Sequence, residues 1–379
     1  MPIYRAGLDI GSTTVKIAIL NQRGELLRAD YRRHYADVGR TIAELMQEAL
    51  ADFGEERVSL MITGSAGIAA SALLDLPFIQ EVVAGLTALR LLLPKADVAI
   101  ELGGEDAKIT YLEGSPEQRM NGSCAGGTGA FLDQMASLLH TDLDGLNALA
   151  ARAQTIYPIA SRCGVFAKSD IQPLLNEGAA QEDIAASIFQ SVVNQTISGL
   201  ACGKPIRGRV AFLGGPLHFL PELRRRFSET LNLTPEQTLL PEQAQVFIAR
   251  GAALSADPSQ ALSGEELLSR LPRLNDRRLD PKRLLPPLFE SEQDLAAFRL
   301  RHAAQAIPTA PLAQASGPLY LGVDAGSTTS KLALTDDAGR LLFDRYRPSA
   351  GRPLETVTAM LKELYQELPP TAFIARSCV

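Results

Sequence analysis

The 379-residue sequence has little cysteine, little histidine and no long apolar run. Four cysteines are too few for a disulfide scaffold and are typical of a reducing compartment. The four histidines are scattered, without the spacing of a metal site. No apolar run approaches the roughly 20 residues that cross a bilayer, and the N-terminus has no apolar signal segment. We therefore expect a cytoplasmic protein with no membrane partner.

Charge and missing motifs exclude further classes of function. A net charge of −6 gives no reason to expect nucleic acid as a partner. No Gly-x-x-x-x-Gly-Lys-Ser/Thr sequence occurs, which excludes a P-loop protein. The glycine run at residues 126–129 has the wrong spacing for a dinucleotide loop. A hydrophobic content of 46% with 21% charged residues is ordinary for a globular protein.

What the sequence does contain is a repeated turn. Gly-Leu-Asp-Ile-Gly-Ser-Thr-Thr begins at Gly7 and recurs almost unchanged, as Gly-Val-Asp-Ala-Gly-Ser-Thr-Thr, at Gly322. Apolar alternation on both sides of each copy predicts a strand, a tight turn and a second strand. An acid, several hydroxyls and free backbone N–H groups can together hold a phosphate and its metal. The sequence therefore predicts a phosphate-binding turn at residues 9–14.

The chain divides into three parts by pattern. Residues 1–256 alternate strand and helix patterns and are expected to form one α/β module. Residues 257–317 are expected to be a connecting region, because prolines cluster there and residues 270–283 carry six basic residues against two acids. Residues 318–379 repeat the start of the module and predict an incomplete second copy, as in the front part of a longer two-module protein. Since its strands lack the rest of their sheet, we expect an exposed apolar edge and poor order beyond Gly317.

Three glycine-marked turns follow predicted strands, at residues 9–14, 101–106 and 214–216. Glycine lets the backbone approach a ligand closely, and acids in the first two turns would flank a metal-phosphate group. This set, in this order, resembles the actin-like ATPase superfamily, which includes sugar kinases and heat-shock 70 chaperones. The resemblance implies a ribonuclease H-like fold of two α/β subdomains around a nucleotide cleft. The first two turns would hold the phosphates, and the third would pack against the adenosine.

Two cysteines stand in short loops, each just ahead of a predicted helix. Cys124 lies in Ser-Cys-Ala-Gly-Gly-Thr-Gly-Ala-Phe, and Cys163 lies in Ser-Arg-Cys-Gly-Val-Phe-Ala-Lys-Ser. A helix N-terminus stabilises a thiolate, and thiolates ligate iron. Two thiols cannot fill the four protein positions of an iron–sulfur cube, but a twofold-symmetric dimer can. Cys202, at the end of an apolar helix, is expected to be structural, and Cys378 carries no assignment.

These cysteine contexts resemble the activators of 2-hydroxyacyl-CoA dehydratases, within the BadF/BadG/BcrA/BcrD ATPase group that includes ATPase subunits of benzoyl-CoA reductase. The resemblance covers residues 3 to about 255. It implies a homodimer with one [4Fe–4S] cluster between the subunits. ATP binding and hydrolysis would then drive an electron into a partner iron–sulfur enzyme, such as an acyl-CoA dehydratase or reductase. A ferredoxin- or flavodoxin-type protein would be the electron donor.

The site residues follow from this resemblance together with their chemistry. Asp9 is expected to hold Mg²⁺. Glu101, Glu105 and Asp106 are expected to hold metal or to orient the attacking water. Glu101 and Glu105 depart from the family pattern, which usually has Asp and Gln there. The expected nucleotide-binding residues are Gly11, Ser12, Thr13, Thr14, Lys16, Gly103, Gly104, Gly127, Gly129, Gly214 and Gly215. Cys124 and Cys163 are expected to ligate the [4Fe–4S] cluster.

Two other classes of function stay open. One is a small-molecule kinase of the same superfamily, such as an N-acetylhexosamine kinase, which would have no use for cysteines in glycine loops. The other is a nucleotide-dependent scaffold like actin-type filament proteins, in which open-ended assembly would replace a closed dimer. The iron content of anaerobically purified protein separates these classes.

Overall fold

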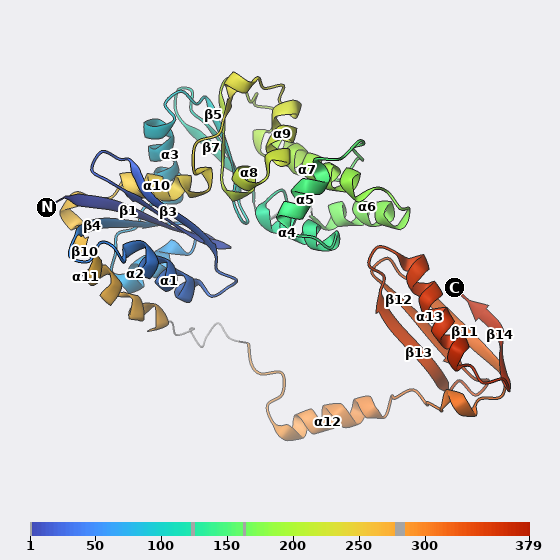
Figure 1. Cartoon of the computed structure of the whole chain (residues 1–379). Coiled ribbons are helices and arrows are strands. Elements are labelled where there is room, and N and C mark those ends of the chain that lie inside the picture. The colour runs from blue at the N-terminus through green and yellow to red at the C-terminus, as the bar shows by residue number, and fades with distance from the viewer. Residues whose placement is uncertain (1, 123–125, 162–163, 277–284) are drawn as a thin grey trace. The chain divides into compact units, whose positions relative to one another are not determined.

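The computed structural model describes residues 2–122, 126–161, 164–276 and 285–379 (Figure 1). Residue contacts divide the chain into two compact units. The first comprises residues 1–170 and 180–277, and the second comprises residues 171–179 and 278–379. Within the described ranges, no helix is both long enough and apolar enough to cross a membrane.

The first sheet of the first unit carries the turn after Asp9. Its strands, in spatial order, are β10 (Leu262–Ser263), β4 (Arg57–Thr63), β1 (Ile3–Ile10), β2 (Thr14–Leu20) and β3 (Leu26–Arg33). β1 and β2 are antiparallel, with Asp9 opposite Lys16, and β4 runs parallel to β1. Leu8 of β1 and Ile17 of β2, which lie opposite each other, are fully buried. They belong to one hydrophobic core with helix α1 (Val38–Leu50), whose N-cap is Asp37.

The second sheet repeats this arrangement. Its strands, in spatial order, are β7 (Glu117–Met120), β6 (Ala107–Tyr111), β5 (Val98–Leu102), β8 (Val210–Leu213) and β9 (Thr238–Leu239). β5 pairs antiparallel with β6 and parallel with β8, as β1 does with β2 and β4. The turn after β5 therefore has the same place in its half of the unit as the turn after β1 has in the other half.

Two helices, α3 (Glu81–Leu92) and α10 (Phe247–Leu254), pack against each other where the two halves meet. α10 lies so close to the first sheet that a Cβ atom at Gly7 would be 1.9 Å from the Ala249 carbonyl oxygen. A Cβ atom at Gly251 would be 2.0 Å from the Ala84 carbonyl oxygen of α3. Glycine at both positions is therefore what allows this backbone contact.

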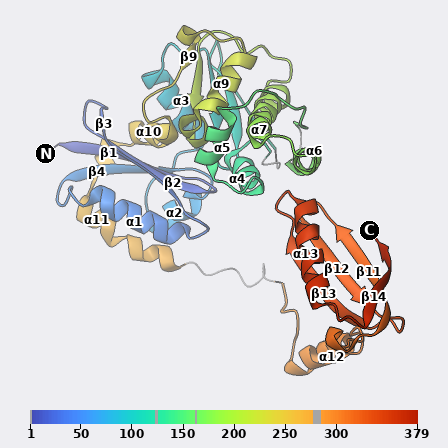
Figure 2. The ribbon, with the colours of Figure 1, turned by 45° about the vertical axis from the view of Figure 1, so that its right-hand side comes forward.

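Helices cover both faces of the first sheet. Figure 2 shows α1, α2 and α11 on one face of the first sheet and α10 on the other. The other helices of the chain up to residue 269 are α2 (Gly67–Leu74), α4 (Gly129–Leu138), α5 (Leu143–Ala150), α6 (Gly164–Asn176), α7 (Gln181–Thr196), α8 (Gly215–Phe219), α9 (Pro221–Thr230) and α11 (Gly264–Ser269). A π-helical turn at Ile197–Ala201 follows α7, and short 3₁₀ turns lie at Pro235–Gln237, Ala244–Val246, Pro258–Gln260 and Leu271–Asp276.

Part of the segment expected to be a connecting region belongs to the first unit. β10 pairs antiparallel with β4. Leu267, Leu271 and Leu274 are buried in the same core as α1. The prediction of a connecting region rested on proline and charge content and overlooked these three leucines. They are spaced at three to four residues, which is the spacing of an apolar stripe on a helix.

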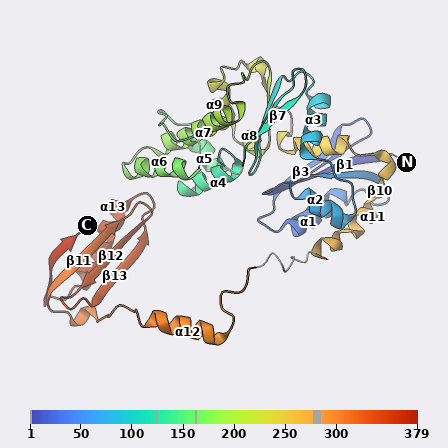
Figure 3. The same cartoon turned by 180° about the vertical axis from the view of Figure 1, so that it is seen from behind.

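The second unit shows the four-strand pattern for a third time. Its elements are α12 (Glu292–Ala303), a 3₁₀ turn (Leu312–Gln314), β11 (Gly317–Ala325), β12 (Thr329–Thr335), β13 (Leu341–Pro348), α13 (Pro353–Glu367) and β14 (Ala372–Cys378). The strand order is β13-β12-β11-β14, with β14 parallel to β11. Figure 3 shows this sheet from the face opposite α13.

The expectation of poor order beyond Gly317 is wrong. Leu319, Leu321, Leu332 and Leu334 of the sheet form a hydrophobic core with Met360 and Leu364 of α13, so one face of the sheet is buried within the unit. β14 is an edge strand of this sheet, and Phe373 on it is 58% exposed.

The contact between α10 and the first sheet yields a stability prediction. Gly7→Ala places a methyl group against a backbone oxygen, and overpacking of this kind costs about 1–3 kcal/mol. We expect the free energy of unfolding of the first unit to fall by about that amount, as measured by hydrogen exchange of β1 amides in urea. Gly322, the equivalent residue of β11, is the matched control, because the nearest described atom to its Cβ position is the Ala333 carbonyl oxygen at 3.8 Å. Equal losses for Gly7→Ala and Gly322→Ala would contradict this account.

Candidate functional site

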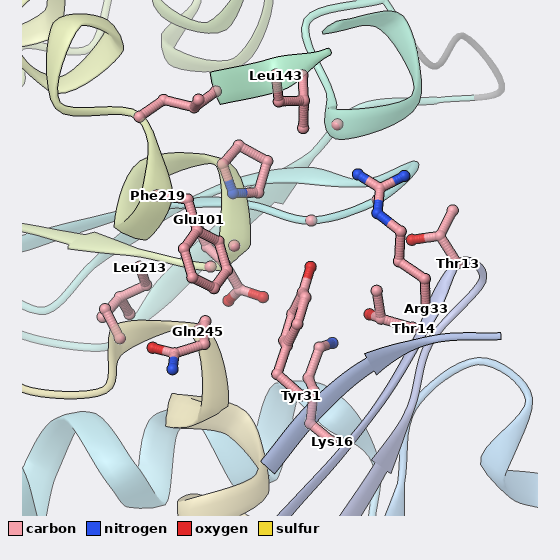
Figure 4. A pocket seen from close by; sticks show the side chains of 18 of the residues that line it. Thr13, Thr14, Lys16, Tyr31, Arg33, Glu101, Leu143, Leu213, Phe219 and Gln245 are labelled. Atoms are coloured by element: carbon pink, nitrogen blue, oxygen red, sulfur yellow. The ribbon is translucent and has the colours of Figure 1, made fainter. Parts of the chain in front are cut away.

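A cavity of about 430 Å³ lies in the first unit, with residues of both sheets in its walls (Figure 4). Many residues expected at the site line it. They are Asp9, Thr13, Thr14, Lys16, Glu101, Gly103, Gly104, Gly129, Gly214 and Gly215. Figure 4 shows the Glu101, Tyr31 and Lys16 side chains directed into the same space from β5, β3 and β2.

Other expected residues have different places. The lining, as far as the structure describes it, does not include Gly11, Ser12, Glu105, Asp106 or Gly127. Glu105 is exposed, and its carbonyl oxygen accepts a hydrogen bond from Asn121 Nδ2 at 3.1 Å. Cys124 and Cys163, the expected cluster ligands, lie outside the described residues.

The first turn fixes a buried ion pair at the base of the cavity. The Gly11 N–H donates to the Thr14 carbonyl oxygen at 2.9 Å and closes the turn. Lys16 Nζ donates to Asp9 Oδ2 at 2.8 Å, and the Asp9 side chain is 3% exposed. Burial alone would lower the pKa of Lys16, but the charge and hydrogen bond of Asp9 outweigh it, so the pKa is raised. Lys16 is therefore charged at neutral pH.

The second turn touches the first. The Gly103 N–H donates to the Asp106 carbonyl oxygen at 2.7 Å and closes this turn. A Cβ atom at Gly104 would lie 2.0 Å from Thr13 Oγ1, so no larger residue fits here without displacing the first turn. The two turns thus face each other at the cavity, one from each half of the unit.

A second buried lysine lies behind the second turn. Lys108 is buried, and its Nζ donates to Glu81 Oε1 and, at 3.3 Å, to Glu101 Oε1. Burial opposes the charge of Lys108, but the carboxylates of Glu101 and Glu81 outweigh burial and raise its pKa. Burial also raises the pKa of Glu81, and the nearby charge of Asp9 raises it further.

The charges around these turns do not balance. When all are ionised, the three carboxylates of Asp9, Glu81 and Glu101 face the two ammonium groups of Lys16 and Lys108. Incoming phosphates would add to the negative surplus, so the site favours a cation beside them. Over the residues that the structure describes, no group of three or more His, Cys, Asp or Glu side chains is placed to hold a metal. Such a cation would therefore depend on phosphate oxygens and water for most of its ligands.

The third turn and an aromatic pair form another wall. Gly214 has a φ of +89°. Its Cβ position is 2.1 Å from the Leu102 carbonyl oxygen, so glycine is required there on two counts. The Tyr31 and Phe219 rings, 5.5 Å apart between centroids, both line the cavity. Flat apolar side chains beside a glycine turn suit a nucleobase, because aromatic rings stack on flat faces.

The second turn is tied to both ends of the segment that contains Cys124. On one side, Asn121 Nδ2 donates to the Glu105 carbonyl oxygen of the turn at 3.1 Å. On the other side, at the start of α4, the Gly129 N–H donates to the Gly103 carbonyl oxygen at 2.9 Å. The Ala130 N–H donates to the Gly104 carbonyl oxygen at 2.8 Å. A displacement of the second turn therefore acts on the backbone on both sides of residues 123–125.

Sequence reasoning missed several residues of the cavity and of its charged surroundings. The main ones are Tyr31, Arg33, Asp133, Phe219 and Gln245, which line the cavity, and Glu81, which lies behind it. The β3 residues were within reach of the sequence, because a strand pairing antiparallel with β2 must end beside the first turn. Arg33 indeed lies opposite Thr14. Glu81 carried no such signal, since only the packing of α3 between the halves brings it to Lys108.

Comparisons with known proteins agree on one family. Residues 6–256 match the BadF/BadG/BcrA/BcrD ATPase family. The chain is 28% identical to the 2-hydroxyisocaproyl-CoA dehydratase activator of Clostridioides difficile over 67% of this chain and 95% of that protein. It is 31% identical to the (R)-2-hydroxyglutaryl-CoA dehydratase activating ATPase of Acidaminococcus fermentans over 57% of this chain and 84% of that protein.

Solved structures give the same result. The Acidaminococcus fermentans (R)-2-hydroxyglutaryl-CoA dehydratase component A matches with a TM-score of 0.60 and 29% identity, over 67% of this chain and 97% of that one. The activator of the 2-hydroxyisocaproyl-CoA dehydratase from Clostridium difficile, solved with bound ADPNP, matches with a TM-score of 0.59 and 26% identity, over 73% and 99%. The expected actin-like ATPase fold is confirmed.

The buried lysine predicts a pH-dependent loss of stability. Lys108→Met leaves Glu81 and Glu101 without their cation, and breaking a buried pair in this way costs about 3–5 kcal/mol. We expect that loss in urea unfolding at pH 7.5. Burial already raises the pKa of Glu81, and without Lys108 its folded-state pKa lies further above the unfolded value. A raised carboxyl pKa destabilises the fold above it, so the loss should shrink as pH falls from 7.5 to 5.

The control for this prediction is Lys204→Met. Lys204 pairs with Glu117 at the surface, with side chains 38% and 43% exposed, and such pairs contribute about 0–1 kcal/mol. A loss of similar size for both variants, or one that is independent of pH, would show that the Lys108 cluster is not the cause.

Proposed function

Since the chain belongs to the BadF/BadG/BcrA/BcrD ATPase family, we propose that it is an ATP-dependent reductive activator. It binds and hydrolyses ATP, and thereby drives an electron from a [4Fe–4S] cluster shared by two copies into a partner iron–sulfur enzyme, such as a 2-hydroxyacyl-CoA dehydratase. One observation carries the proposal: the second turn at the cavity is hydrogen-bonded to both ends of the Cys124 segment. The names of the relatives as dehydratase activators support it.

The phosphates of ATP are held between the first two turns. Backbone N–H groups and the hydroxyls of Thr13 and Thr14 supply hydrogen bonds to them. Mg²⁺ fits the charge surplus of the site, because it accepts one or two carboxylates and completes its shell with phosphate oxygens and water. Asp9, which is paired with Lys16, would supply the carboxylate. When bound, Mg²⁺ neutralises charge on the terminal phosphates.

Hydrolysis needs a water molecule in line with the terminal phosphate, and Glu101 is the group that orients it. Its side chain lines the cavity, whereas Glu105 is exposed. Lys108 Nζ donates to Glu101 Oε1 at 3.3 Å, which holds this carboxylate in place. Glu81 acts through Lys108 and is therefore a positioning residue. The adenosine lies along Gly214 and Gly215, against Tyr31 and Phe219.

Cys124 and Cys163 would hold the cluster, two thiolates from each copy, which makes a homodimer part of the proposal. The cluster supplies one-electron chemistry when bound, and a ferredoxin- or flavodoxin-type protein is the donor. The residues of this chain couple nucleotide binding to the cluster segment. Asn121, Gly129 and Ala130 are hydrogen-bonded to the second turn. When phosphates bind and move that turn, the backbone on both sides of Cys124 therefore moves with it.

The role of Glu101 is tested by a matched pair of variants in the same turn region. We expect Glu101→Gln to lower the kcat of ATP hydrolysis about 10²- to 10³-fold, as for other single groups that position charge in a transition state, with little change in the Kd for ATP. Glu105→Gln should stay within about threefold of the parent, because its side chain is exposed. Steady-state hydrolysis and nucleotide titration measure both. A larger loss for Glu105→Gln would move the catalytic role to that residue.

The cluster is tested by metal analysis of protein purified without oxygen. We expect about four irons and four sulfides per dimer, lost in Cys124→Ala and in Cys163→Ala. Cys202→Ala is the control and should keep the iron, because Cys202 lies at the end of the π-helical turn and its thiol donates to the Gly199 carbonyl oxygen. Iron-free anaerobic protein that phosphorylates a sugar would instead establish the kinase alternative.

A further inference from the structure

One ion pair of the first unit joins its two halves directly at the cavity. Arg33, the last residue of β3, donates from Nη1 to Asp133 Oδ2 at 2.6 Å and from Nη2 to Asp133 Oδ1 at 3.0 Å. This is the bidentate geometry that makes guanidinium–carboxylate pairs strong. Both residues line the cavity, and both side chains are 37% exposed, so a ligand in the cavity can reach them.

The Arg33 end of the pair is fastened to the first turn. Arg33 lies opposite Thr14 in the β2–β3 pairing, and the N–H of the next residue, His34, donates to the Thr13 carbonyl oxygen at 3.1 Å. The His34 ring accepts from the Ala36 N–H at Nδ1, so its Nε2 donates to the Gly11 carbonyl oxygen at 3.3 Å. Figure 4 shows the Arg33 side chain extending from beside Thr13 and Thr14.

The Asp133 end is fastened to the second turn. Asp133 lies on α4, whose first residues, Gly129 and Ala130, donate hydrogen bonds to the carbonyl oxygens of Gly103 and Gly104. The ion pair therefore spans the two turns between which the phosphates are proposed to lie. Asp133 also belongs to the helix that directly follows the Cys124 segment.

A guanidinium group binds a phosphate by the same fork geometry as a carboxylate. A terminal phosphate carries more negative charge than Asp133 and would lie within the same cavity as Arg33. We propose that Arg33 exchanges Asp133 for the terminal phosphate of a bound nucleoside triphosphate, and returns to Asp133 once that phosphate has left. No covalent bond changes in this step. The exchange releases α4 from β3 only while a triphosphate is bound, and it rests on the proposed function as an ATPase.

The exchange makes opposite predictions for the two partners. Asp133→Asn removes the competitor of the phosphate, so ADPNP should bind about tenfold more tightly. Arg33→Gln removes the phosphate ligand, so ADPNP should bind about tenfold more weakly or worse. ADP, which lacks the terminal phosphate, should change by less than about threefold in both variants. Calorimetric titration of the full chain with each nucleotide and Mg²⁺ measures these constants.

The matched control is Glu48→Gln. Glu48 pairs with Arg32, the neighbour of Arg33 on the same strand, and neither residue lines the described cavity wall. This variant should bind both nucleotides as the parent does. It tests whether loss of any β3 ion pair changes binding.

Other outcomes overturn the inference. A pair that serves only as a structural clasp would move ADPNP binding in the same direction in Arg33→Gln and Asp133→Asn, and would change ADP equally. Weaker ADPNP binding by Asp133→Asn alone is enough to reject the exchange, even where Arg33→Gln does not fold. If the parent protein binds neither nucleotide, the proposed function itself fails. If the parent binds both nucleotides but the two variants change ADPNP affinity in the same direction, only the exchange fails.

Discussion

The candidate site depends on the close approach of Gly104 to Thr13. Each turn alone is an ordinary strand connection, closed by its own hydrogen bond, from Gly11 in one half and Gly103 in the other. Because Gly104 has no side chain, the second turn comes against the Thr13 hydroxyl, and residues of both turns then line one cavity. A phosphate chain bound there interacts with both halves at once. Hydrogen bonds join the second turn to Asn121 and to the start of α4, the described residues on either side of Cys124.

Each of the two turns also has an acid–lysine pair beside it. Asp9 and Glu101 belong to equivalent strands of the two halves, and each has its own buried lysine, Lys16 and Lys108. A buried carboxylate without such a partner would take up a proton, because burial disfavours its charged form. Each lysine places a positive charge beside its acid, and Glu81 adds a third carboxyl group to the cluster. This negative surplus opposes the binding of phosphates alone and favours a cation beside them.

Much of this could be read from the sequence, and the reason is locality. The Asp9 turn, the glycines of the other turns and the alternation of the strands are short patterns, and each fixes backbone geometry within a few residues. Glu81 and Asp133 could not be found this way. They reach the site because α3 and α4 pack where distant segments meet, and no pattern near either residue encodes those neighbours. Glu105 was assigned from its place in a motif, but a turn directs adjacent side chains to different sides, and its side chain is exposed.

The two copies of the turn separate what a short sequence determines from what its surroundings determine. In the second unit, Lys331 Nζ donates to Asp324 Oδ2 at 2.6 Å, which repeats the pairing of Lys16 with Asp9. The Asp324 side chain, however, is 61% exposed, whereas that of Asp9 is 3% exposed. The ion pair therefore follows from strand register alone. The burial of the Asp9 pair, and the second turn that lines the cavity with it, come from α10 and the opposite half. The same short sequence therefore gives a solvent-exposed turn in one unit and a cavity wall in the other, and the difference lies in the elements that pack around it.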